Sequence, residues 1–243
     1  PESGSKGTIL MKQGKNAKAN LGFQQYVDSV MDICLKAPGV PATFENNEVI
    51  FLGPDENTAH LMDSACTYSK DRDYSYWRAF TTGKSASLGG IPHDIYGMTT
   101  RSVRQFVEGI MRKKGLKEED CTKVMIGGPD GDLGSNEILL CKEQILGIAD
   151  GSGVICDPNG LDRASLEELA HKRVMVKDFK GKFSDSGFFI SIDDTNVTLP
   201  SGEIVKSGLD FRNSFHLWNG IKADFFVPCG GRPKSIDIDN VSQ

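Results

Sequence analysis

The sequence predicts an α/β protein of the doubly wound type, with helices on both faces of a parallel sheet. Segments typical of strands and of helices alternate along residues 123–172. The 243 residues, 38% of them hydrophobic, are enough to bury a sizeable core. Around residues 186–206 the pattern becomes β-rich on both sides of a Pro200-Ser201-Gly202 turn, which predicts a β-hairpin insertion.

Two helices and a strand are expected within residues 17–72. Apolar residues recur every three or four positions along residues 17–36, which predicts an amphipathic helix. Residues 49–52 are typical of a short buried strand, and residues 56–72 of a second helix. Residues 74–100 lack a clear period, and a loop of this length inside a compact domain usually has a function.

The remaining segments form a regular series. An apolar stripe from Val103 to Met111 predicts a helix that Gly115 closes. Strands are then expected at 123–126, 145–149 and 223–228, and helices at 135–142 and 164–172. Because strands that alternate with helices belong to βαβ units, these strands are predicted to be parallel.

Composition excludes several classes of function. The net charge is −5 without a clustered Lys/Arg stripe, so no nucleic-acid partner is expected. No apolar run approaches the roughly 20 residues that cross a bilayer, so no membrane partner is expected either. The six cysteines form no CxxC pair and the four histidines lack metal-ligand spacing, so no metal site is predicted. The thiols are expected to be reduced and mostly buried, as in an intracellular protein.

The most specific local pattern is the Gly-rich turn after the strand at 123–126. Gly128, Gly131 and Gly134 lie directly before the expected helix. Glycines there permit a tight turn and close approach to a pyrophosphate, and the helix N-terminus offers free N–H groups. Gly131 and Gly134 match the last two positions of G-x-G-x-x-G, whereas Pro129 stands at the first. An ordinary Gly-rich turn is the alternative.

An acidic residue favours the dinucleotide interpretation. Asp150 directly follows the strand at 145–149 and lies 19 residues after Gly131. A carboxylate at this place hydrogen-bonds the adenosine ribose hydroxyls and repels a 2′-phosphate, so NAD is favoured over NADP. The alternative is a plain turn aspartate before Gly151.

Two loop residues are candidates for proton chemistry. Lys6 lies in a Gly/Ser loop, where a buried lysine could act as acid or base. The alternative is a solvated lysine. Asp55 follows the strand at 49–52 and Gly53-Pro54, at the mouth of a sheet. It is either a catalytic carboxylate or the N-cap of the next helix.

Six longer segments complete the pattern. They are PESGSKG at 1–7, FLGPDENT at 51–58, FTTGKSASLGGIPHDIYGMTTRSV at 80–103, GGPDGDLGSNEI at 127–138, DGSGVICDPNGLD at 150–162 and KADFFVPCGGRP at 222–233. With them the chain resembles the glutamate dehydrogenase family from Pro1 to about Val241, most closely a fragment of its large-subunit, NAD-dependent branch. Pro129 is then a mark of that branch.

The resemblance implies domains and catalytic roles. Residues 1–75 would be the C-terminal part of a substrate or catalytic domain, and residues 76–243 a Rossmann-type NAD-binding domain with the hairpin insertion. Lys6 matches the lysine that polarises the reacting carbon through a bound water. Asp55 matches the aspartate that shuttles protons to and from the amine. Glu2-Ser3 departs from the residues usual before this lysine in the small-subunit enzymes.

The resemblance also implies a set of cofactor contacts. Thr99 is the best match to a threonine that contacts the nicotinamide carboxamide, and Arg101 matches an arginine in the same stretch. The full set of expected NAD contacts is Thr99, Gly128, Asp130, Gly131, Asp132, Leu133, Gly134, Ser135, Asp150, Cys229 and Gly230.

The implied reaction is the NAD-dependent oxidative deamination of L-glutamate to 2-oxoglutarate and ammonia. Hydride passes from the glutamate α-carbon to nicotinamide C4, and water attacks the resulting iminoglutarate. The expected partners are these small molecules and, in the full-length protein, further copies in a homo-oligomer. The expected location is the cytoplasm or the mitochondrion. A dehydrogenase of another amino acid, such as leucine or phenylalanine, and a non-catalytic NAD-binding regulatory module are the alternatives.

Overall fold

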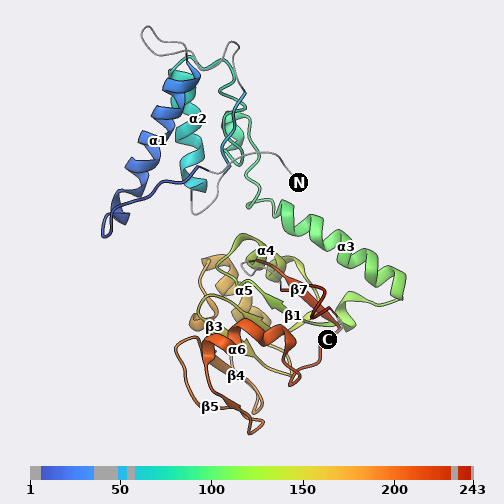
Figure 1. Ribbon diagram of the computed structural model, residues 1–243. Helices are drawn as coiled ribbons and strands as arrows, with labels where there is room; N and C mark the ends of the chain where they lie inside the picture. The colour runs from blue at the N-terminus through green and yellow to red at the C-terminus, as the bar shows by residue number, and fades with distance from the viewer. Residues whose placement is uncertain (1–6, 36–48, 54–57, 231–234, 242–243) are drawn as a thin grey trace. The chain divides into compact units, whose positions relative to one another are not determined.

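The computed structural model describes residues 7–35, 49–53, 58–230 and 235–241 of the chain (Figure 1). The chain forms two compact units, Pro1–His93 and Asp94–Gln243. Each unit buries a hydrophobic core of its own. Lys6 and Asp55 lie outside the described residues.

The first unit is built on two helices, α1 (Ala19–Cys34) and α2 (Met62–Asp71). Short 3-10 turns precede them at Asn16–Lys18 and Ala59–Leu61, and a third follows at Ala86–Leu88. The apolar stripe of α1 packs into a core shared with α2 and the segment after it. This core contains Phe23, Val27, Met31, Leu61, Met62, Ala65, Tyr74 and Phe80. Both helices therefore lie within the predicted ranges, although α2 begins at Met62, after a 3-10 turn, and not near residue 56.

The strand expected at 49–52 is reduced to a single bridge. Leu52 pairs with Thr81 in an isolated parallel bridge. Leu52 N donates to Phe80 O at 2.8 Å, and Thr82 N donates to Leu52 O at 3.0 Å. The segment that follows α2 therefore returns alongside Leu52 and joins the core of the first unit.

The second unit contains an α/β fold around a five-stranded sheet with the order β4-β3-β2-β1-β7. These strands are β1 (Thr122–Ile126), β2 (Gln144–Ala149), β3 (Gly153–Cys156), β4 (Phe188–Ser191) and β7 (Phe225–Pro228). The two pairs that β1 makes, with β2 and with β7, are parallel. The pairs β2–β3 and β3–β4 are antiparallel.

The three strands predicted to be parallel are parallel, but the sheet is mixed because β3 and β4 add antiparallel pairs at one edge. Only residues 150–152 connect β2 to β3. A parallel connection needs about a dozen residues or more. Because this link is much shorter, β3 has to run antiparallel to β2. The β4 residues, expected within the hairpin insertion at 186–206, instead pair with β3 and extend this edge of the main sheet. Only β5 (Val197–Thr198) and β6 (Ile204–Val205) form a separate antiparallel pair, which flanks the turn at 200–202.

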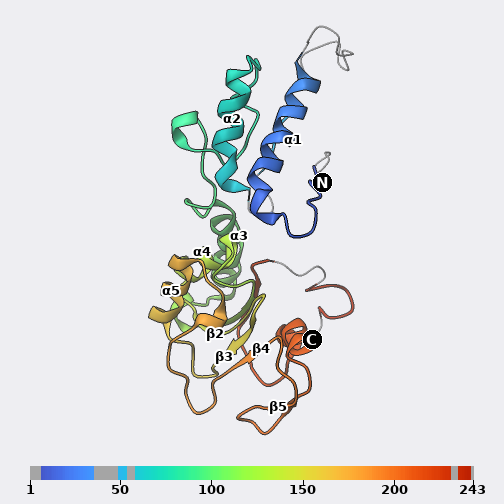
Figure 2. The same ribbon diagram turned by 90° about the vertical axis from the view of Figure 1, so that its left-hand side faces the viewer.

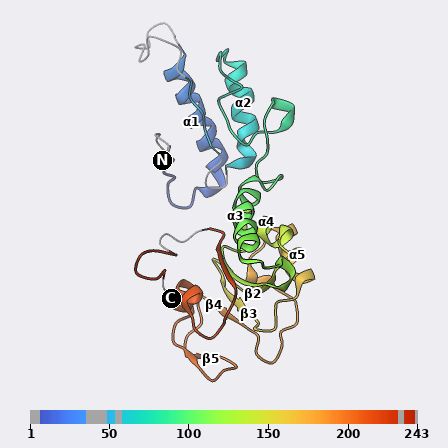
Figure 3. The ribbon, with the colours of Figure 1, turned by 90° about the vertical axis from the view of Figure 1, so that its right-hand side faces the viewer.

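Helices cover both faces of the sheet. On one face α4 (Asp132–Leu140) and α5 (Arg163–Lys172) bury Ile138 and Leu166 against Met125. On the other face α6 (Gly208–Ser214) and the 3-10 turn Phe215–Leu217 contribute Phe211 and Phe215 to a core with Val124 and Ile126. Figure 2 and Figure 3 show α4 and α5 on one side of β2 and β3, and the orange segment that contains α6 on the other. Successive side chains of β1 thus point to opposite faces of the sheet and belong to two different hydrophobic cores.

The other helices of the second unit have recognisable start and stop signals. The α3 helix (Met98–Lys114) packs against α4 and ends at Gly115, which has a φ of +69°. Asp162 caps α5 by accepting from Ser165 N at 2.9 Å. Ser207 caps α6 by accepting from Asp210 N at 3.2 Å. Among the described helices, none is both long and apolar enough to cross a bilayer.

Candidate dinucleotide-binding site

The Gly-rich turn joins β1 to α4 at the carboxyl edge of the parallel strands. β1 ends at Ile126 and α4 begins at Asp132, three residues earlier than the sequence predicts. Gly131 is the N-cap and has no side chain with which to cap the first turn. The backbone amide of Leu133 donates a hydrogen bond to Asp132 Oδ1 at 2.8 Å. The helix N-terminus, with its positive dipole end, therefore opens at this turn.

Two of the three glycines are required by the protein itself. A Cβ on Gly128 would lie 2.4 Å from Asp150 Oδ2, and a Cβ on Gly134 would lie 2.1 Å from Gly128 O. Both distances are far below van der Waals contact, so side chains at these two places would push the turn away from α4 and β2. Gly128 and Gly134 thus allow the turn, the strand and the helix to pack closely.

Gly131 is different. A Cβ on Gly131 would meet nothing closer than Gly128 O at 3.8 Å. Its φ of −87° and ψ of 159° are ordinary extended values that any residue adopts. Gly131 is also exposed. Close packing and backbone strain therefore do not require a glycine here, and the space beside the N-cap of α4 stays open.

A cavity of about 410 Å³ opens beside this turn. It is lined by Ile126, Gly127, Gly128, Asp130, Gly131, Asp132, Leu133, Ala149, Asp150, Gly151, Arg212, Cys229 and Gly230. Eight of the predicted contact residues lie in this lining: Gly128, Asp130, Gly131, Asp132, Leu133, Asp150, Cys229 and Gly230. The structure thus brings together residues from the ends of β1, β2 and β7.

Three of the predicted contact residues are not part of the lining. Gly134 and Ser135 lie in the first turn of α4, where Ser135 Oγ donates to Gly131 O at 2.7 Å. Thr99 is exposed in the first turn of α3, where its neighbour Thr100 donates to Leu133 O at 3.2 Å. Arg101, the other residue of that stretch, donates from Nε to Tyr96 O at 3.0 Å.

Asp150 is buried, and its carboxylate is already hydrogen-bonded. Oδ1 accepts from Ser152 N at 2.8 Å and from Ser152 Oγ at 2.7 Å. Oδ2 accepts from Val176 N at 2.7 Å. Two carboxylate oxygens have about four acceptor positions, so one remains for a ligand hydroxyl. Besides lining the cavity, Asp150 therefore holds the β2–β3 corner to the segment that follows α5.

A second carboxylate lies close to the first. The same Cβ position on Gly128 that is 2.4 Å from Asp150 Oδ2 is 2.9 Å from Asp130 Oδ1. Adding these two distances gives an upper limit of 5.3 Å between the two oxygens. Burial, and then the charge of Asp150, raise the pKa of Asp130 above its ordinary value.

The end of β7 closes another side of the cavity. Cys229 is buried, and its amide donates to Ile126 O at 2.7 Å. Burial, followed by the nearby charge of Glu137, raises the pKa of the Cys229 thiol to about 12, so it is neutral at pH 7. Gly230 follows with a φ of +143°, a conformation in which a side chain would be strained. The side of the cavity formed by Cys229 and Gly230 is therefore uncharged, and its backbone has a conformation that favours glycine.

Arg212 is a lining residue that the sequence did not suggest. Its Nε donates to Asp150 O at 2.6 Å, and its Nη1 donates to Asn213 Oδ1 at 3.1 Å. It comes from α6, a helix that no apolar period revealed. The usable signal was Ser207 with Asp210 three positions later, a pattern that marks a helix N-terminus.

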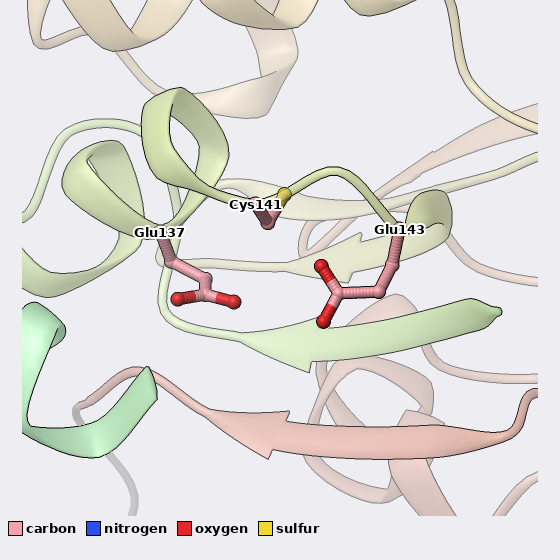
Figure 4. A group of neighbouring side chains, drawn as sticks. All are labelled: Glu137, Cys141 and Glu143. Atoms are coloured by element: carbon pink, nitrogen blue, oxygen red, sulfur yellow. The ribbon is translucent and has the colours of Figure 1, made fainter. Parts of the chain in front are cut away.

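A buried group of charges lies beneath α4. Glu137, Cys141 and Glu143 place their possible ligand atoms within 4.8 Å of one another (Figure 4). Lys123 Nζ bonds Glu137 and lies 3.6 Å from Glu143 Oε2. Arg104 Nη1 lies 2.9 Å from Glu137 Oε1 and 3.4 Å from Glu143 Oε2. Arg104 also pairs with Glu118 through Nη2, so two fixed cations face three carboxylates, and we interpret the group as an ion network.

The pKa of Glu143 follows from this network. Burial alone would raise it, yet the charges of Lys123 and Arg104 hold the pKa of Glu143 below its ordinary value. Only a faint signal for this network is visible in the sequence: Lys123 opens the otherwise apolar strand predicted at 123–126, and Arg104 directly follows the first residue of an apolar stripe.

The fold and the cavity are those of an α/β protein with a Gly-rich turn and a helix N-terminus at the carboxyl edge of its sheet. The family model of the Glutamate/Leucine/Phenylalanine/Valine dehydrogenases matches residues 89–243. The chain therefore belongs to the glutamate, leucine, phenylalanine and valine dehydrogenase family.

Several relatives match along the whole chain. It is 52% identical to glutamate dehydrogenase 2 of Dictyostelium discoideum, over 100% of this chain and 23% of that protein. It is 50% identical to the NAD-specific glutamate dehydrogenase of Neurospora crassa, over 100% of this chain and 24% of that protein. The corresponding enzyme of Saccharomyces cerevisiae is 47% identical, over 99% of this chain and 23% of its own length. The chain thus spans about a quarter of the length of these relatives.

Proposed function

We propose that the protein containing this chain is an NAD-dependent glutamate dehydrogenase, which oxidises L-glutamate to 2-oxoglutarate and ammonia. The observation that carries the proposal is Gly131. It is a glycine at the N-terminus of α4, beside the cavity, that no described contact or backbone angle requires. The names of the 47–52% identical relatives support glutamate as substrate and NAD as cofactor.

The lining fits NAD chemically. The open position at Gly131 gives a diphosphate access to the amides at the start of α4, where the helix dipole favours negative charge. Asp150 has one acceptor position left for a ribose hydroxyl. When bound, NAD supplies the hydride acceptor, and these residues hold and orient it.

The finer fold assignment is part of the same proposal. Residues 76–243 are proposed to be a doubly wound, Rossmann-type NAD-binding domain with a hairpin insertion at about 186–206, although residues 76–93 belong to the first compact unit. Support comes from the two helix-covered faces of the sheet and the β5–β6 pair. Residues 1–75 are proposed to belong to the substrate or catalytic domain, and the complete protein to form a homo-oligomer.

The proton chemistry is assigned to Lys6 and Asp55. Lys6 stabilises negative charge that develops on oxygen, because a fixed ammonium interacts most strongly with the most charged state along the reaction. Asp55 takes and returns the protons of the amine, which requires it within hydrogen-bond reach of that nitrogen. Thr99 is proposed to contact the nicotinamide carboxamide.

Matched glycine substitutions in the complete protein test the cofactor site. Gly131→Ala is expected to lower the thermal midpoint only slightly, because alanine is a poorer N-cap than glycine, and to weaken NAD binding at least about tenfold, because the methyl group occupies the diphosphate position. Gly134→Ala is expected to lower the thermal midpoint, because its Cβ would lie 2.1 Å from Gly128 O. Calorimetric titration with NAD and thermal unfolding measure the two effects.

Gly109→Ala is the matched control. Gly109 lies within α3, and a Cβ there would meet nothing closer than 4.0 Å. This variant should bind NAD as the parent protein does. Unchanged NAD affinity in Gly131→Ala would show that the turn does not hold the dinucleotide.

The choice of substrate has its own test. NADH formation with L-glutamate in the complete protein is the expected result. Turnover with leucine or phenylalanine instead would assign the chain to another amino-acid dehydrogenase. Binding of NAD without turnover of any amino acid would favour a regulatory module.

A further inference from the structure

We propose that Arg212 binds the adenosine half of the dinucleotide, as the cation that an otherwise acidic cavity presents to it. This inference rests on the proposed NAD-binding role of the cavity. It concerns a residue of α6, the helix on the opposite face of the sheet from α4.

The position of the guanidinium is fixed from two sides. Nε donates to Asp150 O at 2.6 Å, and Nη1 donates to Asn213 Oδ1 at 3.1 Å. Asp150 directly follows β2, at the sheet edge where the adenosine ribose is expected. Within the described part of the chain, Nη2 makes no hydrogen bond, and Arg212 lines the cavity. One donor edge is therefore left for a ligand.

The charges of the residues that line the cavity explain why a cation such as Arg212 would favour binding of a dinucleotide. Three carboxylates line the cavity, those of Asp130, Asp132 and Asp150, and Arg212 is the single cation among the lining residues that the structure describes. Asp130 Oδ1 and Asp150 Oδ2 lie within 5.3 Å of each other, the limit set by their distances to Gly128. A dinucleotide adds the negative charge of its diphosphate. Among the described lining residues, Arg212 alone offers this ligand a positive charge beside the carboxylates.

The hydrogen bonds of Asp150 also favour a ligand-binding role for Arg212. Its three hydrogen bonds go to Ser152 and Val176, within the protein, and only one acceptor position remains. Its carbonyl oxygen meanwhile holds Arg212. A guanidinium offers a planar face that stacks on an aromatic base and a free edge that donates to ribose or phosphate oxygens. Asp150 therefore positions Arg212 as well as lining the cavity.

Ligand fragments separate this role from a general effect. In the complete protein, Arg212→Ala is expected to weaken NAD and ADP-ribose binding about 10- to 100-fold, the usual effect of losing a hydrogen bond with a charged donor. Binding of nicotinamide mononucleotide should not change. Calorimetry gives the affinities, and thermal unfolding reports the fold.

Two further variants keep the test decisive. Arg212→Gln retains a donor for the Asp150 carbonyl but removes the charge, so it should fold normally and still lose ADP-ribose affinity. Arg112→Ala removes an exposed arginine of α3 that does not line the cavity, and it should bind both ligands normally.

Three outcomes would contradict the proposals, and they are distinguishable. ADP-ribose affinity within twofold of the parent in both Arg212 variants would overturn the role of Arg212 alone. Equal losses for ADP-ribose and nicotinamide mononucleotide would also overturn it, by showing a general distortion of the site. Absence of NAD binding in the parent protein would overturn the proposed function, and the role of Arg212 with it.

Discussion

Single residues carry the chemistry of the candidate site, and local spacing made most of them predictable. Gly128, Gly131 and Asp130 belong to one short turn, so the sequence itself brings them together. Arg212 was not predictable in this way, because it reaches the end of β2 from a helix 62 residues further along the chain. The Ser207–Asp210 pattern could mark its helix, but nothing in the surrounding sequence marks the contact of Arg212 with Asp150.

The proposed chemistry gives a prediction at Lys6. Lys6→Ala is expected to abolish glutamate turnover and to leave NAD affinity within about twofold, because the role assigned to Lys6 concerns the substrate and not the cofactor. Initial rates and NAD titrations in the complete protein measure the two quantities. Lys12→Ala, at an exposed lysine of the same unit, serves as control. Preserved turnover in Lys6→Ala would remove this residue from the mechanism.

At the scale of elements, the helices were easier to predict than the strands. The helices α1, α3 and α5 show apolar repeats over several turns, and each lies where that repeat predicts it. The strand β3 has four residues, all buried, and such a run has no alternation to reveal it. Its direction follows from the length of the β2–β3 link rather than from its own residues.

The buried ion network joins three elements and was equally invisible. Arg104 on α3, Lys123 on β1 and Glu137 on α4 are far apart in the sequence and meet under α4. Removing one member of such a group leaves a buried charge without its counter-charge, which costs about 3–5 kcal/mol. The network should therefore fix how α3 and α4 pack on β1.

Substitution of the central lysine tests this. Lys123→Met keeps a similar length and removes the charge, so the amides of β1 and α4 are expected to lose about 3–5 kcal/mol of protection against hydrogen exchange. Adding Glu143→Gln removes the excess negative charge and should restore part of that loss. A change below about 1 kcal/mol in the single variant would mean that the network contributes little.

At the scale of the whole molecule, buried thiols set a limit on stability at high pH. Cys66, Cys121, Cys141, Cys156 and Cys229 are buried free thiols. Burial raises the pKa of Cys156, and likewise that of Cys229, from 9.0 to about 12. A raised pKa in the folded state stabilises the protein fully below the ordinary value, and this contribution is lost as the pH rises from about 9 toward 12.

The expected result is a steady fall in stability above pH 9. Each of these two thiols contributes a slope of about 1.4 kcal/mol per pH unit while only its unfolded form ionises. The variant with Cys156→Ala and Cys229→Ala should start less stable and show a flatter decline. Thermal midpoints between pH 8 and pH 11, under reducing conditions, measure this. Cys34→Ala, at a half-buried position, is the control, and equal slopes in all proteins would contradict the assignment.

The three hydrogen bonds that Asp150 accepts also bear on how cofactor preference evolves. The carboxylate proposed to select against a 2′-phosphate is the same group that ties the β2–β3 corner to Val176. A lineage that exchanged Asp150 to adopt NADP would lose that corner at the same moment, so selection would have to supply a replacement anchor first. On this proposal, preference for one nicotinamide coenzyme is protected by the stability of the fold, and a new acceptor for the amides of Ser152 and Val176 is the step that would have to precede a switch.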